Sequence, residues 1–280
     1  QAGEQARAEI DALLAASTTA PFRAPALVDP QVAGALVLAM ALRLTGEETR
    51  NPAGAQTFRG RVGERVLSEE LSLVDDPRQA SYGGKPLLGG YEFDDQGVPA
   101  RRASLIENGK VAGYLLSRYV AKGFPRSNGH ARATPGRIPL AAPANLILTA
   151  RAQQPVDALL LRLREECRRR GLSHGLWIRG ARQYAQEQGS GGQGSIRVKG
   201  GVWLVNAETG ALTRMRDLDL VGTPLVMLGG ILAAGDDPTV WSDTPGGMPV
   251  SVVAPSLLLG DAELQRAQAQ PEKPPLLPAP

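Results

Sequence analysis

Histidine and cysteine, the residues that most often bind metals or support nucleophilic catalysis, are scarce in this chain. Its 280 residues include two histidines, His130 and His174, and one cysteine, Cys167. A zinc site draws three or four ligands mainly from these residue types, usually as closely spaced pairs, and no such pair occurs. A catalytic serine needs a base, and the sequence has no Gly-x-Ser-x-Gly elbow. We expect no metal, no cofactor, two loop histidines and a buried, apolar Cys167 on a helix.

Paired carboxylates are the next candidates, because two of them can share acid and base roles when their environments differ. The pairs are Glu47-Glu48, Asp75-Asp76, Asp94-Asp95 and Asp236-Asp237. Neighbours in a strand point to opposite faces, and neighbours in a turn usually cap backbone amides. We therefore interpret these pairs as turn caps or solvated groups, and keep an acid/base site at Asp94-Asp95 as an alternative.

A glycine-rich segment could in principle bind phosphate. Residues 189–194 read Gly-Ser-Gly-Gly-Gln-Gly, but the following residues 195–198 have the pattern of a strand. A dinucleotide site needs a helix N-terminus at that point to hold the pyrophosphate. We interpret the segment as a flexible hairpin loop that borders a groove.

The charge pattern excludes several partner classes. Lysine and arginine total 31 against 28 acidic residues, and the arginines of 162–170 suit the last turns of a helix. Aromatic residues make up 4% of the chain, too few for a nucleic-acid stacking platform. No apolar run reaches the roughly 20 residues that span a bilayer. We expect a soluble protein with no nucleic-acid or membrane partner, in the cytoplasm unless a signal peptide has been removed.

Hydrophobic periodicity and turn signals predict an α+β fold with mainly antiparallel β-sheets, hairpins and about three helices. Helices are expected over 4–16, 30–44 and 155–170, with a short one over 224–232. Strands are expected at 66–74, 145–149, 176–178, 196–198, 202–205, 218–221 and 250–259, the last followed by a polar helix start. The strongest signal is a hairpin around Asn108-Gly109, a pair suited to a type I′ turn. We expect a linker helix over 1–20, one domain over 21–264 and a proline-rich disordered tail over 265–280.

Several segments together carry a family resemblance. They are Leu73–Pro77 (LVDDP), Phe93–Pro99 (FDDQGVP), Leu105–Gly109 (LIENG), Gly113–Tyr119 (GYLLSRY), Ser127–Arg132 (SNGHAR) and Met248–Leu257. In this order and spacing they resemble the C-terminal domain of the TldD/PmbA family, over residues 21 to 264. The family's own segment at the position of SNGHAR is S-T-G-N-A-R.

The resemblance implies a proteolytic system that processes or degrades unfolded peptides. In that family TldD-type subunits carry a His-Glu-x-x-x-His zinc motif and pair with TldE/PmbA-type subunits that lack it. The motif should lie on the helix of 30–44, where an ungapped match puts Leu38, Ala39 and Arg43 at its three positions. The family's cysteine ligand is also missing from residues 243–247. Without ligands and a carboxylate base, no metal-bound water can be activated.

We therefore expect a catalytically silent, PmbA/TldE-like subunit that forms a homodimer or pairs with a TldD-like zinc subunit. It would bind extended peptide by strand addition, in which the peptide backbone pairs with a sheet edge. The candidate residues for this site or for the subunit interface are Phe93, Asp94, Asp95, Gly97, Pro99, Gly191 and Gly192. Two alternatives remain: a hydrolase with a carboxylate site such as Asp94-Asp95, and a scaffold protein whose proline-rich tail recruits a partner.

Overall fold

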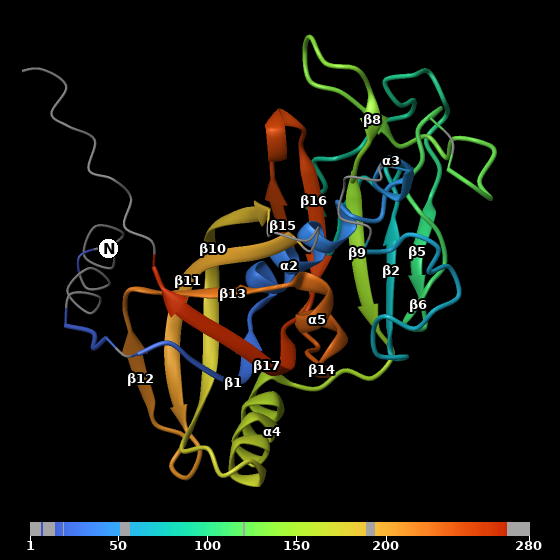
Figure 1. Ribbon diagram of the computed structural model, residues 1–280. Coiled ribbons are helices and arrows are strands. Elements are labelled where there is room, and N and C mark those ends of the chain that lie inside the picture. Colours follow the sequence, from blue (N-terminus) through green and yellow to red (C-terminus); the bar gives the residue numbers. More distant parts are fainter. Residues whose placement is uncertain are drawn as a thin grey trace, which may run out of the picture.

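Two β-sheets enclose one buried helix in the computed structural model of the chain (Figure 1). The structure describes residue 7 and residues 15–18, 20–50, 57–119, 121–188 and 194–267. Mainly antiparallel sheets with four α-helices among these residues confirm the predicted α+β class. None of the described helices is long and apolar enough to cross a membrane.

The first sheet closes on itself. Its ring consists of β1 (Phe22–Val28), β10 (His174–Gln188), β11 (Gly194–Asn206), β13 (Leu218–Gly222) and β17 (Leu257–Arg266). Each strand pairs with the next, and β17 also pairs antiparallel with β1, so these five strands present little free edge. The strands β12 (Leu212–Met215) and β14 (Ile231–Ala234) extend the ring on β11 and β17.

The second sheet is open and carries the loops that form the candidate site. Its order is β15 (Thr239–Asp243), β16 (Val250–Ala254), β9 (Asn145–Ala150), β2 (Leu71–Asp75), β5 (Ala103–Glu107) and β6 (Lys110–Val111). Two short hairpins lie outside both sheets: β3 (Ser81–Tyr82) with β4 (Lys85–Pro86), and β7 (Ala131–Arg132) with β8 (Leu140–Ala141). The β7–β8 hairpin matters most here, because β7 borders the candidate site.

Helix α2 (Pro30–Ala41) lies between the two sheets and is buried on all sides, as its apolar sequence predicts. Asp29 caps it: the carboxylate accepts a hydrogen bond from the Val32 amide at 2.9 Å. Residues 32–41 are all buried. Gly34 lets the helix approach the second sheet, because a Cβ there would lie 3.1 Å from the Trp241 ring of β15.

The remaining helices lie at the periphery. Helix α4 (Val156–Arg169) packs on the outside of the ring through Leu159, Leu163 and the fully buried Cys167, which confirms the apolar role predicted for this cysteine. Helix α5 (Pro224–Gly229) contacts α2 and confirms the short helix predicted near residue 224. Helix α3 (Gly46–Arg50) and the 3₁₀ turn η1 (Pro245–Gly247) were not predicted.

Several predicted elements need correction. The strand expected over 250–259 is two strands, β16 and β17, which enter different sheets. All of β16 and the first four residues of β17 are buried on both faces, so their apolar sequence reads as one run across Pro255. The helix start expected after it is the continuation of β17 to Arg266. Strand β1 was not predicted, and the strand expected at 66–74 spans 71–75. Most of the helix predicted over 4–16 lies outside the described residues.

Candidate functional site

The loop between β4 and β5 brings three predicted site residues to one hollow of about 250 Å³. Phe93, Asp94 and Asp95 line it, together with Leu88, Gly90, Tyr91, Ala131, Arg132, Ala133, Gly247, Met248 and Pro249. Gly97 and Pro99 belong to the same loop but are not among the lining residues. Gly191 and Gly192 lie outside the described residues, so their proposed role stays a prediction.

Asp94 organises the loop rather than facing a reactant. One carboxylate oxygen accepts the amides of Gln96 at 3.0 Å and Val98 at 2.8 Å, and the other accepts the amide of Ala131 at 3.0 Å. Phe93 and Pro99 form a β-bridge across the resulting turn, and Gly97 supplies its positive φ of 72°. Asp94 is therefore a buried cap, as the turn-capping interpretation of the pair predicts.

The backbone donors of this loop are already occupied. The amides of Asp94 and Asp95 donate to the carbonyl oxygens of Val98 and Ala131, and that of Gly97 donates to Asp94, each at 2.9 Å. With the two amides bound by the Asp94 carboxylate, every N–H group from 94 to 98 has a partner. An incoming strand would find no free N–H on residues 94–98, so it could not accept backbone hydrogen bonds from this segment.

Arg132 is held rigidly in the hollow. Its Nη1 donates to the carbonyl oxygens of Pro143 at 2.6 Å and Pro249 at 2.8 Å, and the guanidinium lies 5.5 Å from the centre of the Tyr91 ring. Burial raises the pKa of Tyr91, and the Asp75 charge adds to the effect, so the hydroxyl stays protonated and donates to the Gly129 carbonyl at 3.1 Å. The hollow thus holds a fixed cation.

Beneath the hollow lies a buried polar pair, His130 and Asp75, both fully excluded from solvent. The two carboxylate oxygens of Asp75 accept the amides of Ala144 and Asn145, each at 2.8 Å. Its Oδ1 lies 3.8 Å from His130 Nε2, which has no hydrogen-bond partner among the described residues. The prediction of an ordinary loop histidine was therefore wrong for His130, because its strand neighbour Ala131 carries it into the interior.

Burial shifts the two pKa values of this pair in opposite directions. It raises the pKa of Asp75, against the opposing influence of His130 and of the two bound amides. It lowers the pKa of His130, against the attraction of Asp75. Both shifts favour the neutral forms, as expected for groups removed from water.

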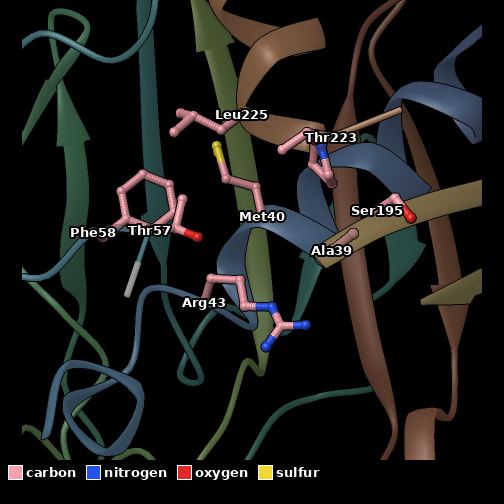
Figure 2. Close-up of a pocket in the computed structure, with 9 residues that line it drawn as sticks. Ala39, Met40, Arg43, Thr57, Phe58, Ser195, Thr223 and Leu225 are labelled. Carbon is pink, nitrogen blue, oxygen red and sulfur yellow. The ribbon is translucent and has the colours of Figure 1, made fainter. Parts of the chain in front are cut away.

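The second candidate position is the C-terminal end of α2, where the family resemblance places a metal (Figure 2). A small hollow there is lined by Ala39, Met40, Arg43, Thr57, Phe58, Ser195, Thr223, Pro224 and Leu225. Leu38 is fully buried in the core. Leu38 and Ala39 have no donor atoms for a metal, and Arg43 is a cation that offers only N–H groups.

A zinc ion does not fit these residues. Zinc requires thiolate, imidazole or carboxylate ligands, and the three motif positions supply none of them. Throughout the described part of the chain, no group of three or more His, Cys, Asp or Glu side chains gathers closely enough to bind a metal. No mechanistic step at this position can therefore be assigned to a bound metal.

The fold consists of a closed ring of strands and an open sheet, which pack around a buried helix. This arrangement defines the class of protein. The family described as the PmbA/TldA metallopeptidase C-terminal domain matches residues 21–266, and the chain belongs to this family. The crystal structure of TldE from Thermococcus kodakarensis has the same fold, with a TM-score of 0.67 and 19% identity, over 94% of this chain and 54% of that one.

Curated relatives are longer proteins. A metalloprotease of Archaeoglobus fulgidus is 29% identical over 175 residues, which cover 62% of this chain and 37% of that protein. A metalloprotease of Methanothermobacter thermautotrophicus is 29% identical over 180 residues, 64% of this chain and 36% of that protein. The chain thus spans little more than a third of these relatives, and the activity of the whole proteins does not transfer with the fold.

Proposed function

We propose that this chain is a zinc-free, PmbA/TldE-like subunit of a TldD-type peptidase system. It would pair with a zinc-bearing subunit, or with itself, and contribute to the binding of unfolded peptide rather than to its cleavage. The observation that carries the proposal is the end of α2, where a family member with an intact helix has Leu38, Ala39 and Arg43 in place of a ligand set. A metallopeptidase needs a metal-bound water and a base, and these side chains supply neither.

The hollow beside Asp94 is the proposed peptide-binding surface. Arg132 offers N–H donors for a peptide carbonyl. Asp95 offers an acceptor, because among the described residues only one of its carboxylate oxygens accepts a backbone amide, that of Ala133 at 2.7 Å. Leu88 and Phe93 are 57% and 59% exposed at its rim, where they would contact apolar side chains. Such a site binds the main chain with little sequence preference, which suits unfolded substrates.

The hydrolase alternative has less support. Acid and base roles need two carboxylates within reach of the substrate, but both oxygens of Asp94 are taken by amides, which leaves Asp95 as the one member of the pair with an available oxygen. The scaffold alternative depends on the proline-rich tail of 271–280, which lies outside the described residues. Deletion of that tail tests it directly, because loss of partner binding with an intact fold would favour the scaffold.

The test compares the chain alone with the chain co-expressed with a TldD-type zinc subunit. We expect the isolated chain to contain no stoichiometric zinc and to leave an unfolded protein substrate uncleaved. We expect the mixture to form a complex by light scattering and to cleave that substrate in a chelator-sensitive way. Cleavage by the isolated chain that survives chelators would favour the hydrolase, and failure of both complex formation and peptide binding would contradict the proposal.

A further inference from the structure

A hollow of about 820 Å³, here called the α3 hollow, lies beside helix α3. Its lining comes from α3 and from later segments of the chain: Thr49, Arg50, Arg59, Gly60, Val62, Tyr114, Lys122, Gly123 and Phe124. Phe58, which precedes Arg59, lines the small hollow at the end of α2, so the two hollows are neighbours. Ligand pockets commonly measure about 300 to 1,000 Å³. The α3 hollow therefore has room for more than one side chain of a bound molecule.

The charged side chains that line the α3 hollow are all cations. Arg50, Arg59 and Lys122 are exposed, and none of them has a hydrogen bond or an ion pair through its side chain to another described residue. No acidic residue lines the hollow within the described part of the chain. Residues 51–56 and 120 contain no charged side chain. Concentrated charge of one sign attracts the opposite sign, so the hollow favours an anionic ligand.

The acidic residues nearest to this hollow along the sequence have other partners. Glu48 lies 3.4 Å from the Arg43 guanidinium, and Glu64 lies 3.6 Å from that of Arg61. Glu47 accepts a backbone amide of β8 at 3.1 Å. These contacts hold the three carboxylates elsewhere, so they do not neutralise the cations of the α3 hollow.

Two aromatic rings give the α3 hollow an apolar wall. The ring of Tyr114 lies edge-on to that of Phe124, with 5.3 Å between the ring centres. Tyr114 is only 4% exposed, and its hydroxyl donates to the Phe58 carbonyl at 2.7 Å. Single-stranded nucleic acid needs exposed aromatic faces on which bases can stack, and this buried ring offers none. Cations beside an apolar wall suit a peptide that carries both acidic and apolar side chains.

The β7–β8 hairpin connects the α3 hollow to the proposed peptide-binding surface. Arg132 of β7, which lines the hollow beside Asp94, is paired across the hairpin with Leu140 of β8. Leu140 and Arg50 line one shallow hollow, together with the exposed side chains of Tyr119 and Ile138. Each step joins direct neighbours, so an extended peptide bound beside Asp94 has a path over the hairpin to the α3 hollow.

We propose that the α3 hollow binds aspartate and glutamate side chains of an unfolded peptide through Arg50, Arg59 and Lys122. Each carboxylate would gain charge-assisted hydrogen bonds from cations that have no partner among the described residues. The aromatic wall would contact apolar side chains next to them. The inference rests on the proposed peptide-binding function and deepens it, because it names acidic segments as the preferred class of substrate.

The test measures the binding of two fluorescent peptides to the full chain at low salt by anisotropy. The peptides share one length and one apolar sequence, and differ at two positions that are glutamate in one and glutamine in the other. We expect the glutamate peptide to bind about tenfold more tightly, the usual effect of one charge-assisted hydrogen bond. The difference should shrink as salt is added, because salt screens exposed charges. The triple variant Arg50→Gln, Arg59→Gln and Lys122→Gln should remove it.

A second triple variant, Lys85→Gln, Arg101→Gln and Arg102→Gln, is the matched control. These three cations are also exposed, have no side-chain hydrogen bond or ion pair in the described part of the chain, and line neither the α3 hollow nor the hollow beside Asp94. The control changes the net charge by the same amount, and we expect it to keep the preference for the glutamate peptide. Exposed substitutions have small effects on stability, which thermal unfolding of both variants verifies.

The possible outcomes separate this inference from the function on which it rests. Equal affinity of the wild type for both peptides would overturn the acidic preference and leave the peptide-binding function in place. Loss of the preference in the control variant would show that net charge produces it, and would overturn the assignment to the α3 hollow. Displacement of the glutamate peptide by less single-stranded DNA than unlabelled peptide would assign the hollow to nucleic acid instead. Binding of neither peptide would contradict the peptide-binding function as well.

Discussion

The surroundings of His130 favour a proton on its ring nitrogen Nδ1. Nδ1 lies 3.2 Å from the Asn128 carbonyl oxygen and 3.0 Å from its Oδ1. The orientation of that amide is fixed, because Oδ1 accepts the Leu116 amide and Nδ2 donates to the Tyr114 carbonyl. Both neighbours of Nδ1 are thus acceptors, so Nδ1 must be the donor. We expect ¹⁵N spectra at pH 7 to show His130 as the neutral Nδ1–H tautomer, with His174→Gln assigning the two rings. The opposite tautomer would contradict this network.

The lowered pKa of His130 makes stability depend on pH in a defined direction. An unfolded imidazole takes up a proton as the pH falls through about 6.5, while the buried ring stays neutral to lower pH. The unfolded state then binds more protons, so the free energy of unfolding should fall as the pH drops from 7 to 5. Relative to His130→Asn, wild type should lose up to about 1.4 kcal/mol per pH unit in urea unfolding. The ionisable neighbours Asp75, Asp94 and Arg132 remain in both proteins, and parallel pH profiles would contradict the assignment.

The substitution Phe93→Ala should affect peptide binding without affecting the stability of the fold. Phe93 is 59% exposed beside the hollow, so Phe93→Ala should change the free energy of unfolding by less than about 0.5 kcal/mol. Removal of the Phe93 ring should also remove an apolar contact with the peptide. We expect this to weaken peptide binding by about tenfold, close to the free energy of burying part of an apolar side chain. Leu161→Ala is the control, because Leu161 is 56% exposed on α4 and does not line this hollow. Equal peptide affinities for both variants, measured by fluorescence anisotropy, would remove Phe93 from the site.

Only part of the candidate site could be predicted from the amino-acid sequence. The Phe-Asp-Asp segment could be selected because its turn residues and the resemblance pointed to it. The roles of Arg132 and His130 could not, because their partners Pro249 and Asp75 lie far away in the sequence. A sequence pattern reports local periodicity, whereas burial of a loop histidine depends on which strands close over it.

At the scale of elements, the hairpin of β5 and β6 shows what local signals can determine. Asn108 and Gly109 both have positive φ, 48° and 78°, as the predicted type I′ turn requires. Turn chemistry is local, so two residues suffice to predict it. The split between β16 and β17 depends instead on which sheet each strand joins, and such long-range pairing leaves no mark on an apolar run.

Gly109 is constrained by contact as well as by conformation. A Cβ there would lie 2.3 Å from the Leu67 carbonyl oxygen, whereas Gly84, with a similar φ of 76°, has nothing within 4 Å. Gly84→Ala should therefore cost only the left-handed strain of about 1 to 2 kcal/mol. Gly109→Ala should cost clearly more, because the backbone of 67–68 must also move. Chemical denaturation of both variants measures the difference, and equal losses would show that the contact relaxes freely.

At the scale of the whole molecule, the chain has the fold of a metallopeptidase family, and Leu38, Ala39 and Arg43 at the end of α2 offer no zinc ligand. A ligand that binds only the native state raises its stability, by about 2.7 kcal/mol at a hundredfold excess over the dissociation constant. For a domain of this size, each kcal/mol corresponds to roughly 2 to 4 °C in Tm. A functional zinc site would therefore raise the Tm by several degrees. We expect zinc and EDTA to leave the Tm of the isolated chain equal within error, because Leu38, Ala39 and Arg43 provide no ligand atom. A saturable increase with zinc that EDTA reverses would mean that a ligand set exists elsewhere in the chain, and it would contradict the proposed non-catalytic role.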